Sequence, residues 1–185
     1  MDRRRVTDVE LMSALAHPLR ARVLRHLMAM GPQTASECAD AVGSTASNCS
    51  WHLRQLARFG LVEPSDAVDG RQRPWRASVV GLELGAPADD PAMRAAQLAV
   101  FGNSMDEEQE LLQRYLDRLD DLDPAWRAAG ALNTYSLTIS AAELTELADQ
   151  VETLVRRYVS TIRTNAPADA EAVHVGFRAF RRLPR

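Results

Sequence analysis

Apolar positions in the first thirty residues recur at the spacing of a helix face. They lie three and four residues apart from Val9 to Leu15, and again from Leu19 to Met28. Pro18 comes directly before the second run, at a first-turn position that a helix tolerates. The pattern predicts a short helix, a second helix beginning at Pro18 and, before both, a loose arm over residues 2–7.

A second helix pair joined by a tight turn is predicted over residues 34–59. Thr34 and Glu37 have the spacing of a capping box, in which side chains satisfy the free amides of a helix start. Gly43 suits the end of this helix because glycine adopts positive φ, and Ser44 or Thr45 can cap the next one. The next helix has apolar positions spaced three and four apart, at Ala46, Cys49, Leu53, Leu56 and Ala57.

The opposite face of that helix carries polar side chains suited to a DNA major groove. Its members are Thr45, Ser47, Asn48, Trp51, His52, Gln55 and Arg58. Asparagine can pair with adenine, hydroxyl groups with several bases, and arginine with guanine or phosphate. An ordinary solvated helix face is the alternative interpretation.

A basic hairpin follows the helix pair. Residues 61–63 are predicted as a short strand, and Asp69-Gly70 is a hairpin turn signal. Three arginines come next, and such a hairpin beside a reading helix suits contact with phosphate or the minor groove. A solubilising edge hairpin would explain the arginines, at Arg71, Arg73 and Arg76, but not their place directly after the helix pair.

The second half of the chain begins with a predicted linker, residues 81–91, and a long helix over 92–122. The apolar seam of this helix steps by three and four through Leu98, Phe101, Met105, Leu112, Tyr115, Leu119 and Leu122, and only Glu108 interrupts it. A heptad pattern of this length favours a coiled contact between two protomers. Packing within one chain is the alternative.

Alternating residues predict strands over 133–139 and 172–180. Ser140 and Glu143 form a second capping box, which opens a helix expected to bury Leu144, Leu147, Val151, Leu154, Val155, Tyr158 and Ile162. The predicted fold is therefore mainly α with small β. It comprises a winged helix-turn-helix domain at 1–80, the linker, and a C-terminal helical α/β domain at 92–185.

The net charge of −3 is unevenly distributed. Residues 1–80 hold eleven arginines against eight acidic residues, and residues 81–165 hold seven against fifteen. An acidic rear would repel phosphate and leave the basic front to meet it. All 22 basic residues are arginine, a bias of the whole chain to which we attach no function.

Four motifs resemble the ArsR-type winged-helix transcriptional regulators, in particular the metal-free branch common in actinobacteria. They are residues 16–24 (AHPLRARVL), 50–53 (SWHL), 60–62 (GLV) and 70–76 (GRQRPWR). The resemblance implies a homodimeric repressor or activator that binds a near-palindromic double-stranded DNA operator, and of the two outputs we expect repression. It carries the DNA-contacting role onto Ser44, Thr45, Ser47, Asn48, Trp51, His52 and Arg54 and onto the wing residues Arg71, Arg73 and Arg76. Arg20 is a further candidate for phosphate contact.

The metal ligands of that family are missing. Thr34, Ala35 and Ser36 occupy the positions of its Cys-x-Cys motif, and Cys49 and His52 are expected to diverge on their helix. We therefore expect no metal and no cofactor.

Other functions have less support. Trp126, Tyr135, Tyr158 and Phe177 are candidates for a small-molecule effector pocket, although ordinary core packing is the commoner role of such aromatics. No catalytic constellation stands out, so an enzyme is not expected. The absence of a disulfide pattern, a signal peptide and a membrane span leads us to expect a cytoplasmic protein. A protein-interaction module that uses the winged fold and long helix without DNA is the alternative function.

Overall fold

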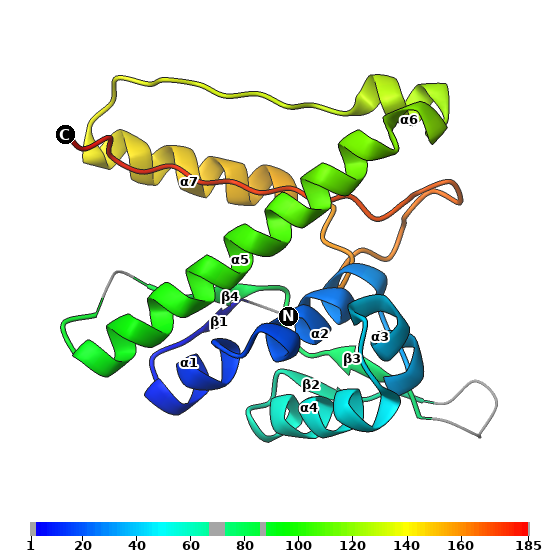
Figure 1. Cartoon of the computed structure of the whole chain (residues 1–185). Coiled ribbons are helices and arrows are strands. Elements are labelled where there is room, and N and C mark those ends of the chain that lie inside the picture. The colour runs from blue at the N-terminus through cyan, green and yellow to red at the C-terminus, as the bar shows by residue number, and fades with distance from the viewer. Residues whose placement is uncertain (1–2, 67–72, 86–87, 185) are drawn as a thin grey trace. The chain divides into compact units, whose positions relative to one another are not determined.

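The computed structural model describes residues 3–66, 73–85 and 88–184 (Figure 1). The described chain is mainly helical with two small sheets, as predicted. Its helices are α1 (Val9–Leu15), α2 (Pro18–Met30), α3 (Ala35–Val42), α4 (Ala46–Arg58), α5 (Pro91–Asp117), the 3-10 helix η1 (Leu119–Asp121), α6 (Pro124–Ala129) and α7 (Ala141–Arg156). Its strands are β1 (Arg4–Arg5), β2 (Val62–Pro64), β3 (Trp75–Ala77) and β4 (Leu82–Glu83).

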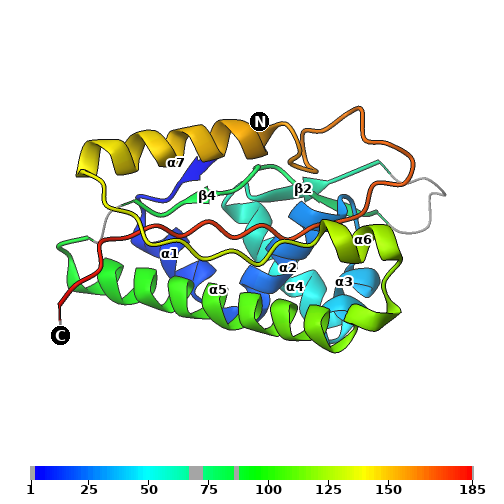
Figure 2. The ribbon, with the colours of Figure 1, turned by 90° about the horizontal axis from the view of Figure 1, so that it is seen from above.

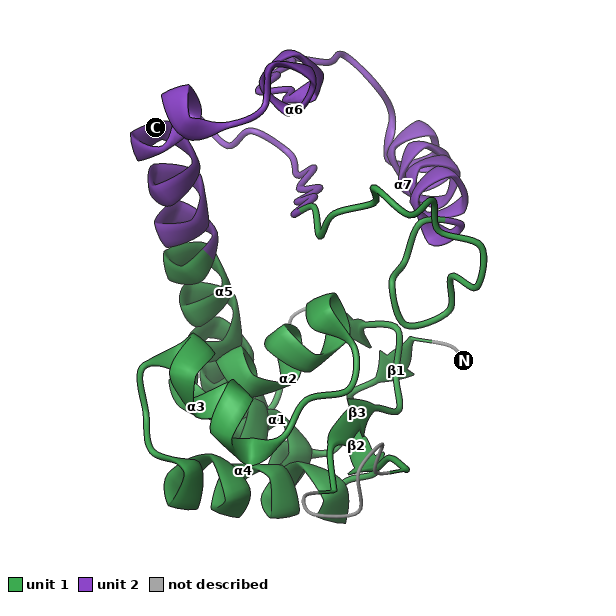
Figure 3. Ribbon diagram, turned by 90° about the vertical axis from the view of Figure 1, so that its right-hand side faces the viewer, with its two compact units in different colours: residues 1–107, 158–173 green, residues 108–157, 174–185 purple. Residues whose placement is uncertain are grey.

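The chain divides into two compact units (Figure 3). The first unit comprises residues 1–107 and 158–173, and the second comprises residues 108–157 and 174–185. These ranges differ from the predicted domains, because α5 contributes residues 91–107 to the first unit and residues 108–117 to the second.

The predicted helix pair forms with its predicted caps. The backbone N–H of Thr34 donates to Glu37 Oε2 at 2.7 Å, and the N–H of Glu37 donates to Thr34 Oγ1 at 3.3 Å. Gly43 ends α3 with a φ of 66°, in the left-handed region that glycine adopts without strain. Thr45 caps α4 by accepting from the N–H of Asn48 at 3.2 Å.

The hairpin after α4 forms the expected wing. β2 and β3 pair antiparallel, with Val62 opposite Ala77 and Pro64 opposite Trp75. Gln33 and Trp75 exchange backbone hydrogen bonds of 2.9 and 2.7 Å, which ties the wing to the turn that precedes α3. The predicted turn at Asp69-Gly70 lies outside the described residues.

A single apolar core holds α1 to α4 and the wing together. Leu24, Leu27, Leu53 and Leu56 expose 1% of their surface or less. α5 runs as one uninterrupted helix (Figure 2), and its Met93, Ala96 and Val100 join the same core. The first half of α5 is therefore packed on the winged domain.

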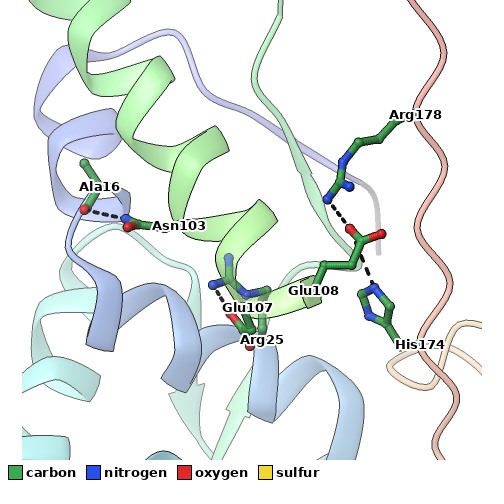
Figure 4. A network of polar contacts seen from close by, with 7 residues as sticks. All are labelled: Ala16, Arg25, Asn103, Glu107, Glu108, His174 and Arg178. Atoms are coloured by element: carbon green, nitrogen blue, oxygen red, sulfur yellow. Dashed lines mark hydrogen bonds and ion pairs between the residues drawn. The ribbon is translucent and has the colours of Figure 1, made fainter. Parts of the chain in front are cut away.

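Polar contacts also fix this half of α5. Asn103 donates its side-chain amide to the carbonyl oxygen of Ala16 at 2.8 Å, and Glu107 forms an ion pair with Arg25 (Figure 4). The predicted loose arm is wrong, because β1 pairs parallel with β4 and Arg5 forms an ion pair with Glu83 at 2.8 Å. Two residues of strand give almost no periodic signal, so only the fold could show this pairing.

The described part of the second unit lacks the buried core of the first. Among the described residues, none after Val100 is buried. The strands predicted over 133–139 and 172–180 are not present, and both segments run as extended chain outside any ladder. Alternation favours an extended backbone, but a strand also needs a hydrogen-bonding partner. α7 has its capping box at Ser140 and Glu143, yet it buries none of the side chains expected to be core.

Within this unit the Glu108 carboxylate accepts a hydrogen bond from Arg178, and it lies 3.9 Å from His174 Nε2. Figure 4 shows both side chains beside this carboxylate. These polar contacts connect α5 to the extended C-terminal segment. No helix among the described residues is long and apolar enough to cross a membrane.

Candidate nucleic-acid interface

The outer face of α4 is polar and open to solvent. Thr45, Ser47, Asn48 and Arg54 are exposed, Trp51 is 46% exposed, and Ser44 is half-buried. This face is fixed because the opposite face of α4 is anchored in the core by Cys49, Leu53 and Leu56, each of which is fully buried. The structure therefore brings most of the predicted contact residues of α4 onto one accessible surface.

Two hydrogen bonds within this region orient its side chains. Asn48 donates its amide to Ser44 Oγ at 3.1 Å, and Arg54 donates to Ser50 Oγ at 3.0 Å. Both bonds are open to solvent and join an exposed residue to a half-buried serine four residues before it. The carbonyl oxygen of Asn48 and the remaining guanidinium N–H groups of Arg54 can still pair with bases or phosphates.

His52 is not on this face, contrary to the sequence-based expectation. It is 2% exposed, and its ring centroid lies 4.7 Å from that of His17. Desolvation, followed by the charges of His17 and Arg20, lowers the pKa of His52 to about 4, so the ring is neutral near pH 7. The signal for burial was present in the sequence, because His52 lies three residues after Cys49 and four before Leu56.

Trp51 connects the exposed face to α2. The Arg20 guanidinium lies 5.6 Å from the centroid of the Trp51 ring, in cation–π geometry. The Trp51 ring also meets His52 edge-on, with centroids 4.8 Å apart. Arg20 and Trp51 come from different helices, and no spacing in the sequence predicts that they touch.

The wing arginines differ in their surroundings. Arg73 is exposed at the described end of the wing. Arg76 forms an ion pair of 2.7 Å with Glu63 on the neighbouring strand, so a carboxylate partly neutralises its charge. Arg71 lies outside the described residues.

Metal ligation has no support from the described residues. Cys38 and Cys49 are both fully buried. Burial raises the pKa of both thiols, that of Cys38 to about 12, so they stay protonated and are poor ligands. No group of three or more His, Cys, Asp and Glu side chains within the described ranges is placed to hold an ion.

The four candidate effector-pocket aromatics are all open to solvent. Trp126, Tyr135 and Phe177 belong to the second unit and are 38, 77 and 47% exposed, while Tyr158 belongs to the first and is 56% exposed. The described structure has a cavity of about 450 Å³ elsewhere, between the β1–β4 pair and the start of α5. None of these four rings lines that cavity.

Comparison with known proteins identifies the domain that bears this surface. Residues 15–64 match a helix-turn-helix domain family. No curated protein matches the chain at a significant level.

Solved structures with a similar arrangement include a MarR family transcription regulator, with 18% identity and a TM-score of 0.33 over 81% of this chain and 78% of that one. A mutant of Lactococcus lactis ZitR has 12% identity and a TM-score of 0.30, over 76% and 73% of the two chains. A Mycobacterium tuberculosis MarR family protein in complex with salicylic acid has 17% identity and a TM-score of 0.30, over 77% and 84%. Because these TM-scores are low, the assignment depends on the domain match and on the geometry of α3 and α4. Residues 15–64 are a helix-turn-helix domain, which supports a DNA-binding regulator.

Proposed function

We propose that this chain is a sequence-specific transcriptional repressor that binds double-stranded DNA as a homodimer. The polar face of α4 would enter the major groove, and the β2–β3 wing would lie along the adjacent backbone. The observation that carries the proposal is the α4 surface. Hydroxyl, amide and guanidinium groups gather on the exposed side of a helix whose other side is locked in the core.

The outer seam of α5 supports the homodimer. Leu98, Phe101, Met105 and Leu112 are 64, 46, 57 and 41% exposed, although they are large and apolar. The face of α5 that packs on the core consists of other residues, among them Met93, Ala96 and Val100, so the seam remains available. A second copy of the same helix would bury it through knobs-into-holes packing.

A two-fold dimer leads to a specific operator and output. It would place two copies of α4 against half-sites one helical turn apart, or a multiple of that, on a near-palindromic duplex. A dimer that covers such a site in a promoter excludes other proteins from it, and we therefore propose repression. Trp126, Tyr135, Tyr158 and Phe177 are the proposed contacts for an apolar effector, because exposed aromatic rings supply the kind of lining that such sites use.

Selection from a random duplex library tests the DNA-binding proposal. The wild-type protein should enrich one near-palindromic sequence, with an affinity that falls steeply as salt rises. Asn48→Ala should relax preference at one position of each half-site, whereas Arg73→Gln should weaken all sequences alike and flatten the salt slope by about one. Arg127→Gln, in the second unit, is the matched control for removing one positive charge.

The outcome that would contradict the proposal is clear. If no sequence were enriched, and the wild-type protein bound duplex DNA no better than Arg73→Gln does, DNA would not be the partner. The exposed seam would then favour the second candidate, a module that binds another polypeptide through α5.

The dimer is tested separately by sedimentation equilibrium. Phe101→Glu places a charge in the seam and should raise the dimer dissociation constant by about a hundredfold or more, because an unpaired charge at an apolar interface is strongly unfavourable. Ala99→Glu adds the same charge to an exposed position on a different face of α5 and should leave association nearly unchanged. Equal association of both variants would exclude this seam as the dimer contact.

A further inference from the structure

We propose that Arg20, stacked on the Trp51 ring, forms a binding site for one phosphate of the DNA backbone where α2 meets α4. The proposal rests on the function proposed above, because the site lies beside the surface of α4 that would enter the groove. It adds α2 to the α4 and wing contacts already proposed. Four observations support it.

The first observation is a cation that lacks an anion. Arg20 is half-buried, and its Nε is shielded from solvent without a hydrogen-bond partner among the described residues. Desolvation lowers its pKa, and no carboxylate acts in the opposite direction. A guanidinium that has lost water without gaining a counterion is stabilised by an anion placed against it.

The second observation is the position of this cation. Its guanidinium lies over the Trp51 ring, 5.6 Å from the centroid, and Trp51 is exposed on the same face as Asn48 and Arg54. Contact with the ring face restrains the guanidinium plane, while the N–H groups at its edge stay free to form a bidentate pair. Phosphate oxygens accept such a pair well.

The third observation is the start of α2. His17 is the N-cap of this 13-residue helix, is exposed, and makes no side-chain cap hydrogen bond. The His17 side chain therefore caps none of the first-turn N–H groups, and the positive end of the helix favours an anion.

The fourth observation is independent of the helix end. His52 is 2% exposed, its ring packs against the His17 ring at 4.7 Å, and its Nδ1 has no hydrogen-bond partner in the described part of the chain. Buried polar groups without partners are uncommon in folded proteins and call for an explanation. An anion held by Arg20 and His17 would bring an acceptor to this corner of the domain.

The chemistry suits phosphate in general, and the placement selects the DNA backbone as its source. In helix-turn-helix proteins the helices around the reading helix cross the backbone and set its register. A side chain that shares a surface with Asn48 and Trp51 would meet a phosphate next to the bases that α4 reads. Free inorganic phosphate is the other source, and the experiment separates the two.

Salt-dependent binding to the selected duplex provides the test. Arg20→Gln should lower affinity about tenfold for selected and random duplexes alike, as expected for one charge-assisted hydrogen-bond pair, and should reduce the salt slope by about 0.9. Arg20→Lys should keep most of the slope while losing part of the affinity. Arg22→Gln, two residues along and so on another side of α2, is the matched control and should change neither quantity.

Three results would overturn the proposal. An unchanged slope in Arg20→Gln, with loss of affinity only for the selected sequence, would show that Arg20 merely orients Trp51. Inorganic phosphate that competes with DNA at matched ionic strength in the wild type, but not in Arg20→Gln, would identify a free-anion site. An Arg20→Lys variant with full DNA affinity and a lowered melting temperature would indicate that Arg20 has a structural role. If circular dichroism shows that Arg20→Gln does not fold, the Arg20→Lys variant serves as the test in its place.

Backbone neutralisation gives a second readout on the unmodified protein. A methylphosphonate scan of the selected duplex should reveal one position per half-site where neutralisation weakens the wild type about tenfold but leaves Arg20→Gln unaffected. If the wild type binds DNA and no such position exists, this inference fails while the proposed function stands. If the wild type binds no duplex, both fail.

Discussion

The winged domain and the second unit have similar apolar sequence patterns but very different packing. In the winged domain, leucines spaced three and four apart on α2 and α4 are almost completely buried. In α7, no leucine at the same spacing is buried: Leu144 and Leu147 are half-buried, and Leu154 is 59% exposed. A helical pattern therefore specifies which face is apolar, but it does not specify what covers that face.

The comparison also bears on stability. A core supplies most of the free energy that opposes chain entropy, so a unit without buried side chains has little stability of its own. The second unit exposes Leu112 of the α5 seam, together with Tyr135, Leu137, Val175 and Phe180. We infer that a second copy of the chain covers part of this surface, in keeping with the proposed homodimer.

The largest expected effect is on the free energy of unfolding, when a leucine in the core of the winged domain and a leucine of the second unit are each shortened to alanine. Leu53→Ala should lower the free energy of unfolding by about 2–5 kcal/mol, because it removes a fully buried side chain from α4. Leu154→Ala should cost less than about 0.5 kcal/mol when the chain is monomeric, as expected for an exposed position. Urea denaturation monitored by circular dichroism measures both.

Leu53→Ala and Leu154→Ala can also show that the two units do not differ in packing. Similar losses at a concentration where the chain is monomeric would mean that α7 has a core within its own chain. A loss for Leu154→Ala that appears only as the protein concentration rises would instead place α7 in the dimer contact.

A smaller effect should appear on acidification. Because burial lowers the pKa of His52 from 6.5 to about 4, the unfolded chain takes up a proton at a higher pH than the folded one. The stability that the neutral ring contributes is complete above pH 6.5 and is lost as pH falls towards 4, by about 2 kcal/mol after allowance for screening. Denaturation at several pH values should show this loss in the wild type and a flatter profile in His52→Gln.

Two histidines set the control for that experiment. Burial also lowers the pKa of His26, which acts in the same direction, so the quantity to compare is the difference between wild type and variant. His26→Gln removes the other contribution of this kind, so the same comparison in that background isolates His52. A wild-type profile identical to that of His52→Gln would show that the ring is not neutral in the folded protein.

The smallest effect concerns the two capping boxes. Thr34→Ala should lower the global free energy of unfolding by about 1 kcal/mol, because the helix that it caps, α3, packs in the apolar core of the winged domain. Ser140→Ala removes the same kind of cap from α7. It should increase fraying of α7 without shifting the main unfolding transition, since that helix buries nothing.

Amide hydrogen exchange distinguishes local fraying from global loss. Slower exchange in α7 than in α3, or a main transition shifted equally by both substitutions, would show that the two units unfold as one.

Local chemistry made the helix pair predictable. Thr34 and Glu37, Gly43 and Thr45 act on groups one helical turn away, so their roles can be read directly from the sequence. The exposed positions of α4 at Ser47, Asn48 and Trp51 follow from its periodicity, whereas Arg54 was expected there only from the family resemblance. The wing was predictable because its strands are close neighbours along the chain.

Contacts between distant segments were not predictable in this way. The β1–β4 pairing joins Arg5 to Glu83, and the Arg20–Trp51 contact joins two helices. The segments 133–139 and 172–180 were expected to be strands because their apolar and polar residues alternate. They form only extended chain, since no neighbouring strand pairs with them in the described structure. His52 was misplaced because its polarity was given more weight than its spacing from Cys49 and Leu56.

The sequence by itself determined where the capped helices α3, α4 and α7 begin, which of their faces are apolar, and that hydroxyl, amide and guanidinium groups share one side of α4. Each of these depends on interactions within a few residues. The tertiary structure decided which apolar faces are covered, that His52 is buried, and that Arg20 stacks on Trp51 with no carboxylate partner among the described residues. These depend on the approach of segments far apart in the chain, which local spacing does not encode.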